Sequence, residues 1–328
     1  MTQRRAFTSL ATSSLLGLHL GVAAQPVGKL WRLGFLNGGP RPADGAPPAA
    51  LRTALQALGY VEGKNIAFEG RWGEVRNERL PALAAEVVAL KVDVLVTSGG
   101  PSAAAAKQAS LSTPVVVVNA GDAVETGLVA SLGRPGGNVT GVNDPAAELS
   151  AKRLEMIKEL VPATRRVAVL WNPGDQAMTL RFRAIERAAQ VLRVSIEPLG
   201  VREPDDFGGA LTAMIRTRPD ALMMVSDALT TLNRQKVVDF AAANRIPAMY
   251  EFGATVKTGG LMSYGSDVGE SFNLVASYVD RILKGAKPAD LPVEQPNRYF
   301  LVINLKTAKA LGLTIPPSLL ARVDEVVD

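Results

Sequence analysis

Few of the residue types that catalyse reactions occur in this sequence. Cysteine is absent, and the single histidine, His19, lies in an N-terminal segment with the features of a secretory signal. Once that segment is removed, no Ser-His-Asp or Cys-His system can form, and the usual zinc, copper and non-haem iron ligand sets are missing. Carboxylate chemistry stays open, although no Asp-rich loop has the spacing of a calcium-binding EF-hand. We therefore expect a protein that is not an enzyme and that binds no metal and no cofactor.

The first 24 residues predict export. Arg4 and Arg5 form a positively charged N-terminal region, and an apolar stretch follows. Small residues precede an expected cleavage at Gln25. The apolar stretch is too short for a membrane anchor, so we expect the segment to be removed. The double arginine also fits a twin-arginine signal, and the Sec and twin-arginine routes both remain open. We predict a location in the periplasm.

Charge and composition exclude other classes of protein. The 36 basic and 31 acidic residues are interleaved, without the Lys/Arg block of a nucleic-acid surface. No run of about 18 apolar residues follows the signal, as a membrane span would require. The length of 328 residues, 47% of them hydrophobic, predicts two globular domains. We expect a monomer that binds a small molecule and no nucleic acid.

Short β-branched runs alternate with longer segments of helical period, which predicts an α/β fold with parallel sheets. Two series of such units suggest two Rossmann-like lobes, with a crossover at 138–144. The first series has strands at 32–36, 65–69, 93–97 and 114–118, and the second at 167–171, 195–199, 221–225 and 248–250. A helix is expected at 231–244. Later elements are a strand at 260–264, a helix at 267–283 and a strand at 299–303.

Polar and aromatic residues follow the strands of both series. In open α/β sheets a ligand binds beyond the carboxyl ends of the strands, so two facing units would place these residues on opposite walls of one cleft. The expected ligand-binding residues of the first unit are Asn37, Trp72, Thr97, Ser98, Gly99, Gly100, Asn119, Asp122 and Asn143. Those of the second unit are Trp171, Asn172, Ser226, Asp227, Tyr250 and Tyr264.

The segment from Thr97 to Ser102 runs from a strand into an Ala-rich helix. Hydroxyls and free backbone N–H groups at a helix N-terminus can hold a carboxylate or a phosphate. Alternatively, Ser98 or Ser102 only caps the helix. The loop after the first strand, with Gly38 and Gly39, lacks the glycine pattern of a dinucleotide site, and the chain has no P-loop.

Two further residues have two interpretations. Asp122 suits either a ligand or a turn. Trp171 suits either a ligand or the hydrophobic core. An aromatic ring and a carboxylate, as at Trp171 and Asp227, would fit a zwitterion with an apolar body.

Four stretches of sequence, spread over the mature chain, form recognisable motifs. They are LGYVEGKN at 58–65 with EGRW at 69–72, SLGRPGGNVTG at 131–141, YVDRILKG at 278–285 and LVINLKTAKALG at 301–312. Together they resemble the substrate-binding proteins of ABC transporters, in the tryptophan/tyrosine-type group. The resemblance implies a type I periplasmic binding protein, whose two lobes close on a small solute. A permease and its ATPase would then be separate chains.

The resemblance also implies domain limits and site residues. The signal would occupy 1–24, lobe 1 would comprise 29–143 plus 265–287, and lobe 2 would comprise 144–264 plus 288–328. The family's carboxylate-binding loop falls on Thr97–Pro101, where the more familiar Gly-Thr-Pro is replaced by Gly-Gly-Pro, which removes a hydroxyl. Asp227 falls where members that bind amino acids could neutralise an ammonium group. The hinge side of the cleft would hold Asn119, Asp122 and Asn143.

We therefore predict the periplasmic solute-binding component of an ABC importer, which traps a small carboxylate between two lobes. The solute would be an amino acid or an aromatic acid. One alternative is a ligand-presenting receptor for a sensor. Another is a secreted carboxylate-dependent α/β hydrolase or lyase, with Asp122 and Asp227 as acid and base.

Overall fold

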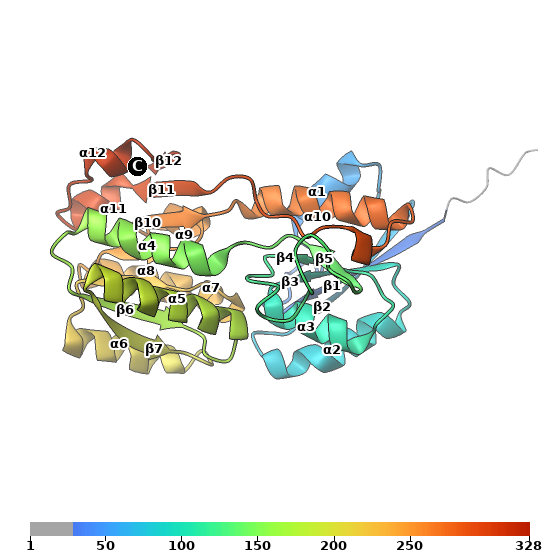
Figure 1. The fold of residues 1–328 in the computed structure, drawn as a ribbon, viewed down its shortest axis with the longest axis horizontal. Coiled ribbons are helices and arrows are strands. Elements are labelled where there is room, and N and C mark those ends of the chain that lie inside the picture. Colours follow the sequence, from blue (N-terminus) through green and yellow to red (C-terminus); the bar gives the residue numbers. More distant parts are fainter. Residues whose placement is uncertain (1–28) are drawn as a thin grey trace, which may run out of the picture.

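The computed structural model describes residues 29–328, which form two α/β halves lying side by side (Figure 1). The expected signal at 1–24 lies outside the described residues. Each half is built around one sheet, and we name the halves the first lobe and the second lobe. The expected fold class, two lobes with mainly parallel sheets, is confirmed.

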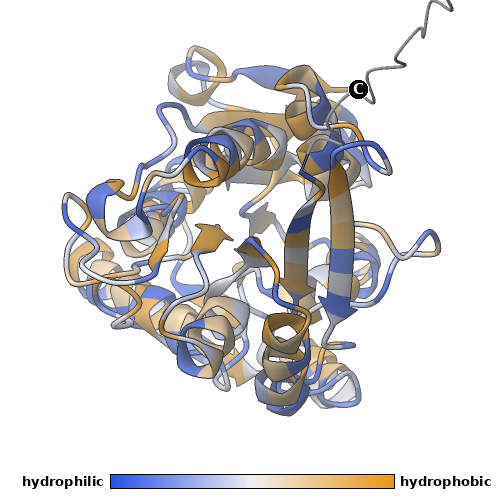
Figure 2. Cartoon of the chain, turned by 90° about the vertical axis from the view of Figure 1, so that its right-hand side faces the viewer, coloured by the Kyte–Doolittle hydropathy of each residue, from blue (hydrophilic) through white to orange (hydrophobic). Residues whose placement is uncertain are grey.

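The first lobe contains a parallel sheet in the order β2-β1-β3-β4-β5. Its strands are β1 (Trp31–Asn37), β2 (Ile66–Trp72), β3 (Val94–Ser98), β4 (Val115–Val118) and β5 (Val139–Gly141). One face is covered by α1 (Ala49–Ala57) and α10 (Val268–Leu283), and the other by α2 (Leu80–Ala89) and α3 (Gly100–Ala109). Side chains alternate along a strand, so Val96 packs toward α10 and Leu95 toward α2. Figure 2 views this lobe end-on, with hydrophobic strands surrounded by helices.

The second lobe contains a sheet in the order β12-β11-β10-β9-β8-β6-β7, parallel except between β10 and β11. Its strands are β6 (Arg166–Trp171), β7 (Ser195–Gly200), β8 (Ala221–Met224), β9 (Ala248–Tyr250), β10 (Met262–Gly265), β11 (Phe300–Asn304) and β12 (Glu325–Val327). One face is covered by α4 (Ala146–Leu160), α5 (Gln176–Leu192), α11 (Leu305–Ala310) and α12 (Pro317–Leu320). The other face is covered by α6 (Asp206–Thr217), α7 (Ala228–Leu232) and α8 (Arg234–Ala243). The short α9 (Gly253–Lys257) packs against β10 and β11.

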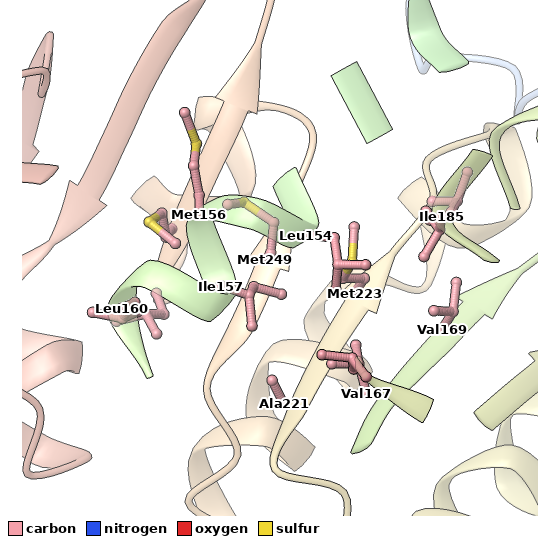
Figure 3. Packing of buried hydrophobic residues seen from close by; sticks show 14 of the residues in the cluster. Leu154, Met156, Ile157, Leu160, Val167, Val169, Ile185, Ala221, Met223 and Met249 are labelled. Carbon is pink, nitrogen blue, oxygen red and sulfur yellow. The ribbon is translucent and has the colours of Figure 1, made fainter. Parts of the chain in front are cut away.

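A hydrophobic core fixes the helices of the second lobe that reach the boundary between the lobes (Figure 3). Leu154 and Ile157 of α4 and Ile185 of α5 pack with Met223 of β8 and Met249 of β9. Methionine side chains adapt to irregular spaces between branched neighbours. This packing holds α4 and α5, from which two buried arginines extend, at fixed positions on the sheet.

The chain crosses between the lobes after β5, after β10 and before β11. After the second crossover, α10 packs on α1 and β4 of the first lobe. The segment that follows α10 stays with this lobe. Val293 N–H donates to the carbonyl oxygen of Leu132 at 2.7 Å, and Glu294 N–H donates to that of Gly141 at 3.0 Å. We therefore propose that the last crossover follows Glu294, later than the boundary at 287 expected from the sequence.

Three elements differ from the sequence-based expectation. The helix expected at 231–244 begins at Ala228 and is divided at Asn233, where α7 ends and α8 begins. The side chain of Asn233 donates to the carbonyl oxygen of Leu229, a local bond that competes with helix continuation. The short α9 and β12 were not expected, since so few residues carry no readable period.

Candidate functional site

The loops at the carboxyl ends of both sheets meet where the lobes touch. A Cβ atom on Gly100 of α3 would lie 3.9 Å from the Cβ of Ala177 of α5. A Cβ on Gly121, in the loop after β4, would lie 2.7 Å from a terminal nitrogen of Arg181. Val75, in the loop after β2, packs against the core of the second lobe. Thus the strand-end loops expected to carry a ligand site do face one another.

Helix α3 begins at this boundary with an uncapped N-terminus. Its N-cap residue, Gly99, has a φ of 82°, a left-handed conformation that favours glycine, and no side chain caps the first turn. Ser98 and Ser102 therefore do not serve as the cap. The N–H groups of the first turn and the helix dipole favour an anion here. Close by, Thr97 is buried and its Oγ1 has no hydrogen-bond partner within residues 29–328.

The loops after β4 and β5 bring three acceptor oxygens to the boundary. Asn119 and Asp122 have left-handed φ values of 54° and 52°, and the N–H of Asp122 donates to the carbonyl oxygen of Asp144 at 3.4 Å. Asn143 pins these loops, because its Oδ1 accepts from the N–H of Ala123 at 2.7 Å. In contrast, Oδ1 of Asn119, Oδ2 of Asp122 and Oδ1 of Asp144 are buried without a partner in the described part of the chain. These three atoms can accept from a donor group.

A buried ion-pair network joins these loops to the second lobe. Arg181 of α5 lies 2.6 Å from Oε2 of Glu251 and 3.5 Å from Oδ2 of Asp144. Arg153 of α4 lies 3.0 Å from Oε1 of Glu251, and its Nε donates to the carbonyl oxygen of Tyr264 at 2.7 Å. Each of the four charged side chains is at most 6% exposed. Because a buried charge is tolerated only when it is paired, this network fixes α4, α5 and the first crossover relative to one another.

Carboxylates dominate the electrostatics around Arg181. Burial by itself lowers the pKa of this guanidinium, since it disfavours the charged form. The surrounding carboxylates outweigh burial and raise its pKa above the usual range; they belong to Glu251, Asp144, Asp122 and Asp175. Arg181 is therefore charged at any pH at which the protein is folded.

Asp122 should make the stability of the ligand-free protein depend on pH. Burial is the main cause that raises its pKa from 3.8 to about 6; Arg181 opposes the shift and Asp144 adds to it. The folded state therefore holds this proton more tightly than the unfolded chain does. The resulting stabilisation is complete below about pH 4 and is lost as the pH rises through about 6. Asp122→Asn, neutral throughout, should lack this dependence.

Urea unfolding at about pH 4.5 and about pH 7.5 measures the effect. We expect the free energy of unfolding of the wild type, relative to Asp122→Asn, to fall between the two conditions. Because both proteins share every other titrating group, the difference isolates Asp122. An identical pH dependence in the two proteins would contradict this account of the carboxyl group.

The strand ends of the second lobe carry residues with structural roles. The ring of Trp171 stacks on Phe182 with centroids 4.4 Å apart, and its buried Nε1 has no partner among the residues described. Asn172 donates from Nδ2 to Oδ2 of Asp227 at 2.7 Å. Asp227 also accepts from the N–H and the hydroxyl of Thr230, and so caps α7. The carboxylate that we expected to face an ammonium group is thus engaged in capping a helix.

Four other expected site residues lie in turns or cores. Oδ1 of Asn37 accepts from a following N–H and forms the turn after β1. Trp72 is buried in the core of the first lobe, and Ser226 is buried directly after β8. Tyr250 does not face the boundary: its ring is fully buried on the α8 side, where a Cβ on Gly260 would lie 2.8 Å from it. Burial also raises the pKa of Tyr250.

Two tyrosines stand together at the second crossover. Tyr264, at the end of β10, lies with its ring centroid 6.2 Å from that of Tyr299. Burial, assisted by Asp144 and Tyr264, raises the pKa of Tyr299 to about 12. Two half-buried aromatic rings therefore lie near the carboxylate of Asp144.

The sequence patterns do not single out the ion-pair network. Arg153 and Arg181 lie within amphipathic helices, where arginine normally faces water, and no local signal marks them as buried. Two of the acids follow expected site residues directly, Asp144 after Asn143 and Glu251 after Tyr250, so their positions at strand ends were readable. Tyr299 precedes β11, at the start of a strand, where the strand-end rule does not apply.

A hollow of about 480 Å³ lies elsewhere in the second lobe. It is bordered by α8, α9 and α11, and its lining includes Lys257, Thr258, Lys306 and Thr307. None of the expected site residues lines it. We place the candidate site between the lobes, because buried polar atoms without partners in residues 29–328 come from both sides of this boundary, among them those of Asp122, Asp144 and Arg181.

Two lobes with facing strand-end loops define a two-lobed binding protein of the type I periplasmic class. The sequence matches the family of ABC transporter substrate binding proteins over residues 45–327, and the chain belongs to this family. The resemblance carried by the four motifs is thereby confirmed. Proteins of this family act outside the cytoplasmic membrane. Within residues 29–328, no helix is both long enough and apolar enough to span a membrane.

Three similar proteins illustrate the relationship. The tyrosine-binding protein of Clostridioides difficile (strain R20291) is 26% identical over 260 residues, 79% of this chain and 74% of that protein. The crystal structure of a conserved domain protein from Vibrio cholerae has a TM-score of 0.83 and 28% identity, covering 91% of this chain and 100% of the other. The ABC domain from Streptococcus pneumoniae, solved in complex with L-Trp, has a TM-score of 0.83 and 26% identity with the same coverage.

Proposed function

We propose that this protein is the periplasmic solute-binding component of an ABC importer and traps an aromatic amino acid between its lobes. The observation that carries this proposal is the set of buried polar atoms without partners, contributed by both lobes where their strand-end loops meet. Buried polar groups are normally hydrogen-bonded, so such a set is what a bound polar solute would satisfy. The permease and the ATPase would be separate chains, and the exported form would be a monomer.

The uncapped start of α3 supports a carboxylate as one end of the solute. The N–H groups of its first turn and the hydroxyl of Thr97 lie at the same edge of the first lobe. Both can donate to a carboxylate oxygen, and the helix dipole adds a favourable field. Ser102, buried within the first turn, adds a further hydroxyl.

Aromatic rings on the second lobe support an aromatic body for the solute. Trp171 is partly buried at the end of β6, in a stack with Phe182, and Tyr264 pairs with Tyr299. Aromatic rings gain from offset or tilted contacts with one another. The relatives point the same way, since one is named for binding tyrosine and another was solved with L-Trp.

A thermal-shift screen tests this proposal. At a hundredfold excess over Kd, binding stabilises the folded state by about 2.7 kcal/mol. At about 2 to 4 °C per kcal/mol, L-tryptophan, L-tyrosine or L-phenylalanine should raise the melting temperature by several degrees. Thr97→Val should reduce the shift, whereas Thr212→Val, on the exposed face of α6, should leave it unchanged. No shift with any aromatic amino acid, aromatic acid or dicarboxylate would refute the proposal.

Two further measurements separate this function from the alternatives. Chromatography of the ligand recovered from the protein should return it unchanged, while conversion would indicate the hydrolase or lyase. Uptake of the labelled amino acid should fall in cells that lack the protein. Normal uptake with a lost regulatory response would instead indicate a receptor for a sensor.

A further inference from the structure

The space where the lobes meet is surrounded by more carboxylates than guanidinium groups. The acids that raise the pKa of Arg181 are Glu251, Asp144, Asp122 and Asp175. Arg153 is the other guanidinium of this network, and Glu251 pairs with it as well. A solute that brings a positive charge to the carboxylate-rich side would balance this excess.

We propose that Asp122, Asp144 and Asn119 form the subsite for a positively charged ammonium group on the solute. This inference rests on the proposed function and deepens it, because it requires the solute to be an amino acid and not a plain aromatic acid. It also assigns recognition of the ammonium group to the loops after β4 and β5, in place of Asp227.

Asp144 is placed to bind a cation. Its side chain is 6% exposed, Oδ2 lies 3.5 Å from Arg181, and Oδ1 is buried without a partner in residues 29–328. An ammonium group has three N–H donors, and the unpartnered oxygens of Asp144, Asp122 and Asn119 provide three acceptors. The number of donors equals the number of acceptors.

Aromatic rings reinforce the preference for a cation. Tyr264 and Tyr299 lie near Asp144, close enough that the carboxylate helps to raise the pKa of Tyr299. The face of an aromatic ring attracts an ammonium group. Carboxylate oxygens and ring faces thus favour the same charge.

The remaining carboxylates are occupied by the protein itself. Asp175 caps α5, accepting from the N–H of Ala177 at 2.8 Å, and Asp227 caps α7 while accepting from Asn172. Glu251 bridges the two buried arginines. Asp122 and Asp144 are the acids of this group that keep a buried oxygen without a partner among the described residues.

The two ends of an α-amino acid need neighbouring subsites, and the fold provides them. The start of α3 lies beside the loop after β4, since a Cβ on Gly100 would lie 3.4 Å from the carbonyl oxygen of Ala120. The carboxylate subsite at α3 and the acceptor group that begins at Asn119 are therefore adjacent. A free α-amino acid, whose two charged groups are joined by one carbon, fits this spacing.

Calorimetric titration with matched probes tests the subsite. L-tryptophan is compared with 3-(indol-3-yl)propanoate, and L-tyrosine with 3-(4-hydroxyphenyl)propanoate, each pair differing in the amino group. The wild type should prefer the amino acids by at least about tenfold. Asp144→Asn should weaken binding of the amino acids by about tenfold or more. Binding of the des-amino acids should be unchanged or tighter.

Two further variants provide a second test of the subsite and a control. Asp122→Asn, at a less buried position, should act in the same direction as Asp144→Asn even if the latter folds poorly. Asp227→Asn is the matched control, because it alters an acid at a strand end that caps α7 and accepts from Asn172. It should change the affinities for both members of each pair equally.

The outcomes separate the subsite from the function. If Asp122→Asn and Asp144→Asn weaken both members of a pair equally, or if the wild type does not discriminate between them, the ammonium subsite is wrong while the solute-binding function stands. If no probe binds, both are wrong. A selective loss of affinity for the amino acids, with the affinity for the des-amino acids kept, supports the subsite.

Discussion

Arg181→Met should lower the free energy of unfolding by about 3 to 5 kcal/mol, the usual result of removing one partner from a buried ion-pair network. Methionine keeps the unbranched stem of the side chain but removes the charged guanidinium group. Glu251 would keep only Arg153, and Asp144 would lose the cation that lies 3.5 Å from it. Urea unfolding at neutral pH measures the change.

A surface arginine provides the matched control. Arg71 lies 2.8 Å from Glu86, and the two side chains are 31% and 55% exposed. An ion pair in contact with solvent contributes about 1 kcal/mol or less. Arg71→Met should therefore have a small effect. If the free energy of unfolding of Arg181→Met were within about 1 kcal/mol of that of Arg71→Met, the buried network would not stabilise the fold as proposed.

Gly100→Leu should weaken binding of an aromatic amino acid by about 100-fold while changing the melting temperature of the ligand-free protein little. A Cβ at this position already lies at van der Waals distance from Ala177, so a longer side chain would hold the lobes apart. Gly100→Ala is the control, because its single methyl group fits at 3.4 Å and 3.9 Å from its neighbours. Titration calorimetry gives the affinities.

Small-angle X-ray scattering separates closure from a local clash with the solute. With saturating amino acid, the wild type and Gly100→Ala should have the same radius of gyration. Gly100→Leu should have a larger one. Equal affinity in wild type and Gly100→Leu would mean that contact between α3 and α5 is not part of the bound state.

Much of the fold was predictable because its central strands, such as β4 and β8, are buried on both faces. Runs such as Val115–Val118 are continuously apolar, as expected for a parallel sheet covered by helices, and they are bounded by turn residues. The positions of α10 and β11 were harder, since periodicity does not say to which sheet an element returns. That expectation came from the resemblance to a family.

The sequence selects candidate site residues by their position at strand ends, but it does not show which side chains they contact. The strand-end rule selects Thr97, Asn119 and Asp122, each of which keeps a buried oxygen without a partner in the described part of the chain. It also selects Asp227, although Asp227 and Thr230 have the spacing of a helix cap, and this local signal was present in the sequence. Arg181 could not be found in this way, because only the packed fold shows that it is buried beside Glu251 and the crossover residue Asp144.

A crystal structure of the protein, determined from crystals grown with L-tryptophan, tests the central claim most directly. We expect the amino acid between the lobes, with its carboxylate at the first turn of α3 and its ammonium group within hydrogen-bond distance of Asp122 and Asp144. Its ring should lie near Trp171 or the tyrosine pair. A ligand bound in the hollow beside Lys257 and Lys306, with nothing bound between the lobes, would contradict the account.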